Sequence, residues 1–410
     1  MLLRTIKNVM IRRCLSTTKN TNFNNNLLKT VVLSNGSPNM NLKLEKAVLS
    51  NISSVNHQEE FCDDAIDAHA IISWRVPELR KVELEQLENC VVISRVGVGV
   101  DSVDIKLAGE LGIRVNNIPA YGTEEVADHT MVHILNLYRK FSIAIKNVEN
   151  NVQTTTANAT TQQLCKGARR IRGEKLGIIG FGRIGMAVAR KAAAFGFHVG
   201  FYDPYVGDGM CKSQGVDRYE KLDDLLANSD CISLHCTHTD ETHFILNDNN
   251  LKNKVKDDVF IVNTARGGLI DDFALGEQVR AGKIAGAGID CQTSEPAIFH
   301  SLSNDGPFQD CGDQVVVTPH SAFFSEPSIL DMKTMSANEA AIVLSTKTDD
   351  IRNAYYRNCV NEQYLNYDDP MFMIYHNSNI IQYYIIIPDS PSIGFVVDRE
   401  SSESDGVRMR

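Results

Sequence analysis

The chain has 410 residues, of which 43% are hydrophobic, and its 51 acidic and 41 basic residues give a formal net charge of −10. This length and apolar content suit two domains, each with its own core. The acidic balance, without a basic stripe, argues against direct nucleic-acid binding, and the ten scattered cysteines indicate neither disulfides nor a metal site.

The first 27 residues are predicted to form a basic leader. No acidic residue precedes Glu45, whereas Arg4, Arg12 and Arg13 are basic, and serine and threonine follow them. This composition is typical of a mitochondrial presequence, although a disordered basic tail would share it. We therefore expect the protein in mitochondria or in the cytoplasm. No apolar run approaches the roughly 18 residues of a membrane span, so no membrane association is expected.

Residues 28–128 are predicted to form most of a smaller α/β substrate domain. Three short apolar segments in this region have the length and residue types of buried strands. They are Thr30–Leu33, Ala70–Ser73 and Val91–Ser94. A crossover helix near His129–Ala144 is expected to lead the chain into the next domain.

A glycine-rich motif after residue 179 predicts a dinucleotide site. The apolar strand Lys175–Ile179 runs into Gly180-Phe181-Gly182-Arg183-Ile184-Gly185, and a helical pattern follows from Met186 to Phe195. In this arrangement Gly180 permits the tight turn, Gly182 lets the backbone approach a pyrophosphate, and Gly185 lets helix and strand pack closely. The helix N-terminus would attract the phosphates. Arg183 would either clamp the pyrophosphate or be a solvated residue at the helix start.

An acidic residue after the next strand predicts which dinucleotide is bound. The strand His198–Tyr202 ends at Asp203, close to the spacing of about 20 residues expected for the carboxylate that binds an adenosine ribose. An acid at this position repels a 2′-phosphate, so NAD is favoured over NADP. The alternative is that Asp203 and Pro204 only form a turn.

Strand and helix patterns go on alternating beyond Asp203, which is typical of a doubly wound parallel sheet. The further strands are Cys231–His235, Val259–Asn263, Ala285–Asp290 and Val315–Thr318. Ligands of such sheets bind beyond the carboxyl ends of the strands, so the residues that follow each apolar run are expected to face cofactor and substrate.

The predicted fold is therefore α/β, with two doubly wound parallel-sheet domains. A Rossmann-type NAD domain, residues 129–324, is inserted in a flavodoxin-like substrate domain. A helix near Glu326–Leu344 is expected to return the chain to the substrate domain, so that residues 325–362 complete it. Residues 363–410 form a tail in which no motif is recognised.

Three residues at such positions suit hydride transfer on a 2-hydroxy or 2-keto acid. Arg266 has the planar fork that binds a carboxylate bidentately. His320 is a natural acid–base, because its ordinary pKa of about 6.5 lies near working pH. Glu295 would orient the imidazole and stabilise its charged form, as an acid does in a hydrolase triad. Each residue taken alone also has a non-catalytic interpretation. The arginine could be a surface ion-pair partner, Glu295 and Pro296 could form a turn, and the histidine could lie in a loop.

At these residues the chain resembles the D-isomer-specific 2-hydroxyacid dehydrogenases, and within them the branch that contains the C-terminal-binding protein corepressors. The resemblance extends from about Lys29 to Asn361. The motifs that carry it are Arg95–Asp101, Glu124–Asp128, Ala168–Gly173, Phe201–Tyr205, Val262–Gly268 and Asn358–Asn361.

The resemblance implies roles for particular residues. Arg266, Glu295 and His320 correspond to the catalytic arginine, glutamate and histidine, and Asp203 to the ribose-binding acid. The expected cofactor contacts are Gly180, Gly182, Arg183, Ile184, Gly185, Asp203, Cys236, Thr264, Ala265, Asp290 and His320, with Asp290 at the nicotinamide amide. The expected substrate contacts are Arg266, Phe323 and the backbone of Val98 and Gly99. Phe323 replaces a tryptophan of the corepressors, so an indole N–H donor is lost from the pocket wall.

Two functions follow from this pattern. The first is an NAD-dependent D-2-hydroxyacid dehydrogenase, expected as a homodimer that acts on a small 2-hydroxy or 2-keto acid. The second is an NAD(H)-sensing transcriptional corepressor with residual dehydrogenase activity, which would bind transcription-factor peptides and reside in the nucleus. The catalytic residues do not separate the two, because the corepressors resemble dehydrogenases at the same positions.

Overall fold

The computed structural model describes residues 27–35, 40–75, 77–154, 161–293, 305–346 and 358–365, together with the backbone of 382–385 and 393–396. The predicted leader, apart from its last residue, and Glu295 lie outside the described residues. The chain divides into two compact units, residues 1–121 with 329–410 and residues 122–328.

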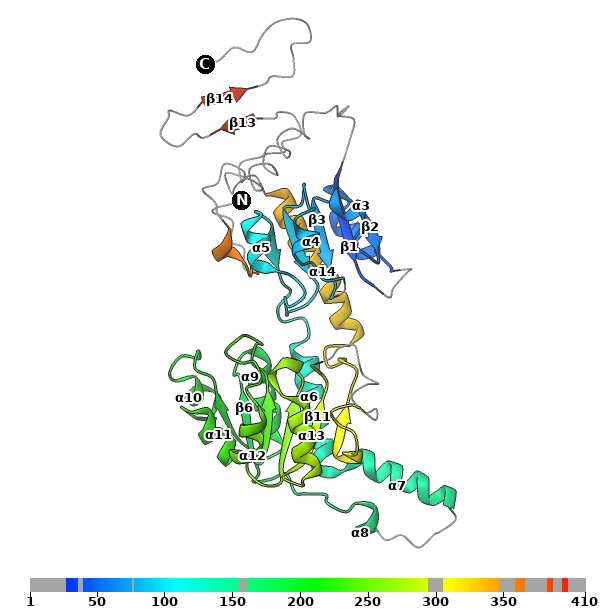
Figure 1. The fold of residues 1–410 in the computed structure, drawn as a ribbon, viewed down its shortest axis with the longest axis vertical. Coiled ribbons are helices and arrows are strands. Elements are labelled where there is room, and N and C mark those ends of the chain that lie inside the picture. Colours follow the sequence, from blue (N-terminus) through cyan, green and yellow to red (C-terminus); the bar gives the residue numbers. More distant parts are fainter. Residues whose placement is uncertain are drawn as a thin grey trace, which may run out of the picture. The chain divides into compact units, whose positions relative to one another are not determined.

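The first unit is built on a five-stranded parallel sheet in the order β2-β1-β3-β4-β5 (Figure 1). Its strands are β1 (Leu28–Leu33), β2 (Ser53–Gln58), β3 (Ala70–Ser73), β4 (Val92–Arg95) and β5 (Arg114–Asn116). This is the strand order of flavodoxin-like folds. The sequence predicted β1, β3 and β4.

Two strands of this sheet were missed, for different physical reasons. β2 is an edge strand of mostly polar residues, and only Ser53 and Val55 of it are buried. β5 has three residues, and its Arg114 and Asn116 are polar but buried. The side chain of Asn116 donates to Glu339 Oε2 at 2.8 Å, a partner far along the chain. Local apolar patterning therefore gives no strand signal in either segment.

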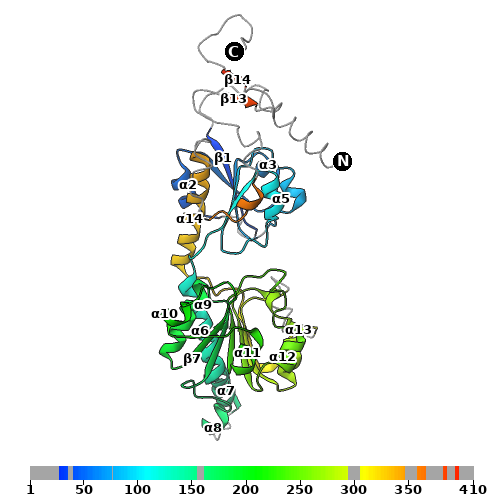
Figure 2. The same ribbon diagram turned by 90° about the vertical axis from the view of Figure 1, so that its left-hand side faces the viewer.

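Helices cover both faces of the first sheet. The helices α3 (Asp63–Ile66), α4 (Lys81–Leu84) and α5 (Ile105–Glu110) pack on one face, and Figure 2 shows α2 (Lys43–Leu49) and α14 (Glu326–Ser345) on the other. The returning segment binds through Asn361, whose buried amide donates to the carbonyls of Ile105 and Ile113 and accepts from the amide of Val115. The helix predicted over residues 326–344 is confirmed as α14.

The second unit contains a seven-stranded sheet in the order β12-β11-β10-β9-β6-β7-β8. Its strands are β6 (Lys175–Ile179), β7 (His198–Tyr202), β8 (Asp217–Arg218), β9 (Cys231–Leu234), β10 (Val259–Asn263), β11 (Ile284–Ile289) and β12 (Val315–Val317). Every paired strand is parallel. This is the doubly wound order of a Rossmann fold, in which the strand order reverses between β6 and β9. The predicted fold class is confirmed.

Helices also cover both faces of the second sheet. The helices α6 (Thr123–Arg139) and α9 (Arg183–Ala194) share one core with the sheet, and α11 (Leu222–Asn228), α12 (Asp248–Asn253) and α13 (Asp272–Arg280) share the other. The other α-helices in the described part of this unit are α7 (Phe141–Thr154), α8 (Thr161–Leu164) and α10 (Met210–Gln214).

The crossover helix begins earlier and ends earlier than the sequence predicted. It is α6, which starts at Thr123 rather than near residue 129 and ends at Arg139 rather than near residue 144. Lys140 interrupts it, because a left-handed backbone with φ of 52° cannot continue an α-helix. The chain then starts α7.

Within the predicted tail, β13 (Gln382–Ile385) pairs antiparallel with β14 (Ile393–Val396). Among the described residues, none of the helices combines the length and apolar content needed to cross a bilayer.

Candidate active site

The glycine loop lies at the reversal point of the second sheet, between the carboxyl ends of β6 and β9. Gly180 has a φ of 91°, and a Cβ there would clash with the backbone of Cys236 after β9. A Cβ on Gly185 would clash with the carbonyl oxygen of Gly180. These two glycines are therefore required by close backbone contacts.

Gly182 differs from its neighbours because a Cβ there would meet no atom within 4 Å. It precedes the first turn of α9, and no side chain caps this helix start. An uncapped helix N-terminus facing open space beside a glycine offers amides and a positive dipole to an anion. Arg183 is exposed at this end, whereas Ile184 packs against the core, so Ile184 would contribute its backbone.

Asp203 lies beside this loop. Its Oδ2 accepts from the amide of Phe181 at 2.8 Å, and its Oδ1 accepts from the amide of Tyr205 at 2.9 Å. A carboxylate can accept about four hydrogen bonds, so two positions are left for hydroxyl donors. Together with the open space at Gly182, this arrangement fits the ribose and pyrophosphate of a dinucleotide.

Arg266 follows β10 in a segment shaped by a buried side chain. Asn263 accepts from the amide of Ala265 at 3.1 Å and donates to the carbonyl of Arg266 at 2.8 Å. The half-buried guanidinium donates from Nη1 to the carbonyl of Ala265 at 2.7 Å, which uses one of its five N–H groups. The backbone of Gln292 and Thr293 packs against Gly267, where a Cβ would not fit.

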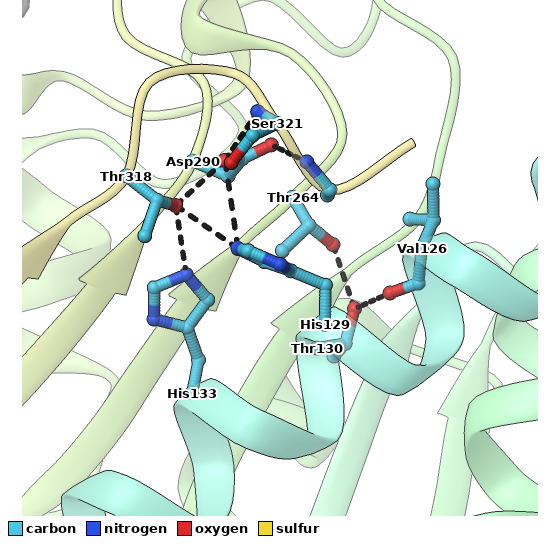
Figure 3. Close-up of polar contacts among 9 residues, drawn as sticks. Val126, His129, Thr130, His133, Thr264, Asp290, Thr318 and Ser321 are labelled. Carbon is cyan, nitrogen blue, oxygen red and sulfur yellow. Dashed lines mark hydrogen bonds and ion pairs between the residues drawn. The ribbon is translucent and has the colours of Figure 1, made fainter. Parts of the chain in front are cut away.

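His320 lies in a segment that is bonded to the end of β11. Its backbone has a φ of 51°, and its amide lies 3.0 Å from the carbonyl oxygens of Asp290 and Thr318. The Asp290 carboxylate accepts from Thr318 Oγ1 at 2.6 Å, from the amide of Ser321 at 2.9 Å and from the amide of Ala322 at 3.0 Å (Figure 3). The Asp290 side chain is 0% exposed, so these bonds hold the segment that carries His320, and the contact with a nicotinamide amide stays a prediction.

The other predicted contacts are distributed as follows. The ring of Phe323 meets that of His320 edge to face, with 6.1 Å between centroids. The hydroxyl of Thr264 lies 2.8 Å from that of Thr130 on α6, so the Thr264 side chain is directed at that helix. Burial raises the pKa of the Cys236 thiol to about 12, which keeps it neutral.

The predicted substrate contacts of the first unit follow β4. Among the described residues, the amides of Val98 and Gly99 have no protein acceptor, while the carbonyl of Val98 accepts from the Asn117 side chain at 2.8 Å. Two adjacent amides of this kind can bind a carboxylate. Glu295, the third catalytic candidate, lies outside the described residues.

The sequence did not identify His129 and His133 of α6 as part of the site. Nε2 of each lies 3.1 Å from Thr318 Oγ1 (Figure 3). Burial lowers the pKa of His133 to about 4, so its ring is neutral at physiological pH. Their i, i+4 spacing places both on one helix face. This spacing in the sequence could have indicated that the two histidines act together, but the segment was interpreted only as a crossover helix.

Asp272, the first residue of α13, supports the same end of the sheet. It is 5% exposed, and its Oδ2 accepts from the amide and the hydroxyl of Thr293 at 2.9 and 3.0 Å. Burial raises the pKa of its carboxyl to about 6, against the opposing effect of the two hydrogen bonds. The buried carboxylate is therefore destabilising once it is ionised.

This raised pKa predicts how Asp272→Asn changes stability with pH. A carboxyl whose pKa is higher in the folded protein stabilises it below about pH 4, and this contribution is lost as the pH rises through about 6. The variant keeps an acceptor for Thr293 without the charge. We compare the free energy of unfolding of the variant with that of the wild type at each pH. The difference should favour the variant more at pH 8 than at pH 4, by up to about 3 kcal/mol.

Urea denaturation at the two pH values would measure this difference. Asp240→Asn, at an exposed side chain of the same unit, controls for the loss of one negative charge. An equal change at both pH values would contradict the prediction.

The sheet order, the glycine loop at the reversal point and the acid after β7 define a dinucleotide-binding α/β protein. Residues 131–322 match the family model for the NAD-binding domain of the D-isomer specific 2-hydroxyacid dehydrogenases. The chain belongs to this family, as its sequence motifs predicted, and NAD is the cofactor of the matched domain.

Known relatives include proteins of both predicted kinds. C-terminal-binding protein 1 of Caenorhabditis elegans is 37% identical over 273 residues, 67% of this chain and 37% of that protein. D-3-phosphoglycerate dehydrogenase of Mycobacterium leprae (strain TN) is 37% identical over 229 residues, 56% of this chain and 40% of that protein. The chain thus spans well under half the length of these relatives.

A solved structure resembles this chain over a larger share of its length. The D-lactate dehydrogenase of Aquifex aeolicus, complexed with NAD and lactic acid, superposes with a TM-score of 0.68 at 28% identity. The match covers 81% of this chain and 99% of that one.

Proposed function

We propose that this protein is an NAD-dependent oxidoreductase that transfers hydride between nicotinamide and a small D-2-hydroxy or 2-keto acid. One observation carries the proposal. Arg266 and His320 follow β10 and β12, which both adjoin β11, and Asp290 bonds the His320 segment to the end of β11. A carboxylate-binding cation and an acid–base group thus share the edge of the sheet where ligands of this fold bind.

Bound NAD would supply the hydride acceptor or donor. The protein's own residues would do the rest: Arg266 binds the substrate carboxylate and polarises the neighbouring C2 oxygen. An imidazole nitrogen of His320 takes the hydroxyl proton during oxidation and returns it during reduction. The amides of Val98 and Gly99 remain proposed as donors to a substrate carboxylate, and Glu295 is proposed to hold the imidazole in the required tautomer.

The substrate class rests on two supports. The Arg266 fork suits an α-carboxylate, and the Aquifex aeolicus relative was solved with lactic acid. The Phe323 ring next to His320 is an apolar wall, which favours a substrate with a short apolar or hydrogen substituent at C2.

The test is NADH oxidation by the full-length protein with a panel of small 2-keto acids, beside His320→Ala and Arg266→Ala. We expect turnover on at least one acid and its loss in both variants. Tight NADH binding without turnover on any acid would contradict the proposal.

The similarity to C-terminal-binding protein 1 supports a second candidate, an NAD(H)-sensing corepressor that binds transcription-factor peptides. Location would separate the two functions. The dehydrogenase proposal includes a mitochondrial or cytoplasmic location, and residues 1–30 fused to a fluorescent protein would report import. A full-length protein found in the nucleus would favour the corepressor.

We also propose that the protein forms a homodimer through α7, which extends away from the sheet of its unit (Figure 1). Phe141, Ile145 and Val148 are exposed by 65%, 45% and 49% and form a stripe at i, i+4 and i+7. An apolar stripe of this kind suits a second copy of the same helix. Light scattering should give a dimer mass for the wild type and a monomer mass for Ile145→Glu, and a wild-type monomer would contradict the proposal.

A further inference from the structure

Thr318 joins α6 to the segment that carries His320. Its hydroxyl oxygen has three neighbours: Asp290 Oδ1 at 2.6 Å, His129 Nε2 at 3.1 Å and His133 Nε2 at 3.1 Å. A hydroxyl has one proton and two lone pairs. The carboxylate can only accept, so the single proton of Thr318 goes to Asp290 and both histidines must donate. The hydrogen-bonding capacity of this hydroxyl is therefore filled.

This arrangement fixes the state of His133. Burial keeps its ring neutral, with a pKa of about 4, so the donor at Nε2 requires the Nε2–H tautomer. The ring also packs closely against β11, because a Cβ on Gly288 would meet Nδ1 at 2.7 Å. His129 lies beside it, with 5.0 Å between ring centroids, and its Nε2 is 3.6 Å from Asp290 Oδ1.

The same carboxylate imposes an unfavourable backbone on His320. A left-handed conformation at a residue other than glycine is costly and persists only where several contacts enforce it. The enforcing contacts are the bonds from Ser321 and Ala322 to the Asp290 carboxylate and those from the His320 amide. Any rotation of the carboxylate would loosen the bonds from Ser321 and Ala322, and Thr318 opposes that rotation.

We infer that His129 and His133 are positioning residues that hold His320 in its working orientation through Thr318 and Asp290. The inference rests on the proposed function and deepens it. Besides Glu295, which is proposed to orient the imidazole, it gives two residues of α6 a role in positioning His320. The two histidines do not touch the substrate in this role. They fix the direction of the Thr318 hydroxyl, and the hydroxyl fixes the carboxylate.

The test compares His133→Leu with His133→Gln in the full-length protein. Leucine fills the space without a donor, whereas glutamine can present an N–H near the position of Nε2. We expect His133→Leu to lower kcat for 2-keto acid reduction about tenfold, with the KM for NADH within about twofold of the wild type. His133→Gln should restore most of kcat, and His198→Leu, at an exposed histidine of the same unit, should have no effect.

Thr318→Val tests the route of this effect. It should lower kcat by a similar factor, and the double variant with His133→Leu should lose no more than either single variant, because both remove the same link. Additive losses would overturn the inference. If His133→Leu does not fold, Thr318→Val and His133→Gln still test the inference. It then requires that Thr318→Val lowers kcat and that His133→Gln does not.

A readout without substrate separates this inference from the proposed function. In protein labelled with ¹⁵N-histidine, the ring signals of His320 are identified by their loss in His320→Ala. Thr318→Val and His133→Leu should shift these signals alike, and His133→Gln should leave them in place. A wild type without turnover would defeat the proposed function and leave this readout intact. Unchanged His320 signals in both disruptive variants would overturn the positioning role.

Discussion

Gly185→Ala is expected to destabilise the protein strongly and to abolish NADH binding. The added Cβ would overlap the carbonyl oxygen of Gly180, a backbone atom whose position is fixed because Gly180 itself adjoins Cys236. Overpacking of this kind costs about 1–3 kcal/mol or more. The β6–α9 packing must open to accept the methyl group, which also displaces the amides at the start of α9. Thermal unfolding and NADH fluorescence titration measure the two effects.

Gly182→Ala is the matched control in the same loop. Nothing lies within 4 Å of its Cβ position, so only the preference of a helix N-cap for glycine over alanine should matter, and stability should fall by no more than about 1 kcal/mol. The methyl group would instead stand where a pyrophosphate approaches, so we expect NADH affinity to fall by at least about tenfold. A variant that binds NADH as tightly as the wild type would show that the phosphates lie elsewhere.

Replacing Arg266 or His320 should have the largest effects on catalysis. Removing the acid–base group in His320→Gln should lower kcat for 2-keto acid reduction by about 10²–10⁴. The dissociation constant of NADH should change little, since the dinucleotide contacts proposed at the glycine loop and Asp203 remain.

Arg266→Lys tests whether the planar fork matters or only its charge. A lysine keeps the charge but cannot bind a carboxylate bidentately, so kcat/KM for the keto acid should fall by about 10²-fold or more, mainly through KM. Arg266→Ala should lose further activity because the C2 oxygen is no longer polarised. If Arg266→Lys kept wild-type kcat/KM, the carboxylate would have to bind at another group.

Much of the second unit could be predicted because its strands are buried on both faces. β6, β7 and β10 were predicted at their observed bounds. In β10, for example, Val259–Val262 are apolar and polar residues begin at Asn263. Asp203, Arg266 and His320 were predicted as site residues by the same logic, because they follow such runs. β8 was missed because its two residues, Asp217 and Arg218, carry no apolar signal.

The sequence by itself determined the fold class, the order of glycines around the dinucleotide loop and the identity of Arg266 and His320 as candidates. These properties are local, because a few consecutive residues determine a strand, a tight turn or a polar residue at a strand end. Only the tertiary structure decided what holds His320. Asp290 and Thr318 follow two different strands, β11 and β12, and His129 and His133 come from α6. The direction of a single hydroxyl proton depends on all of its neighbours at once, and no stretch of sequence contains them together.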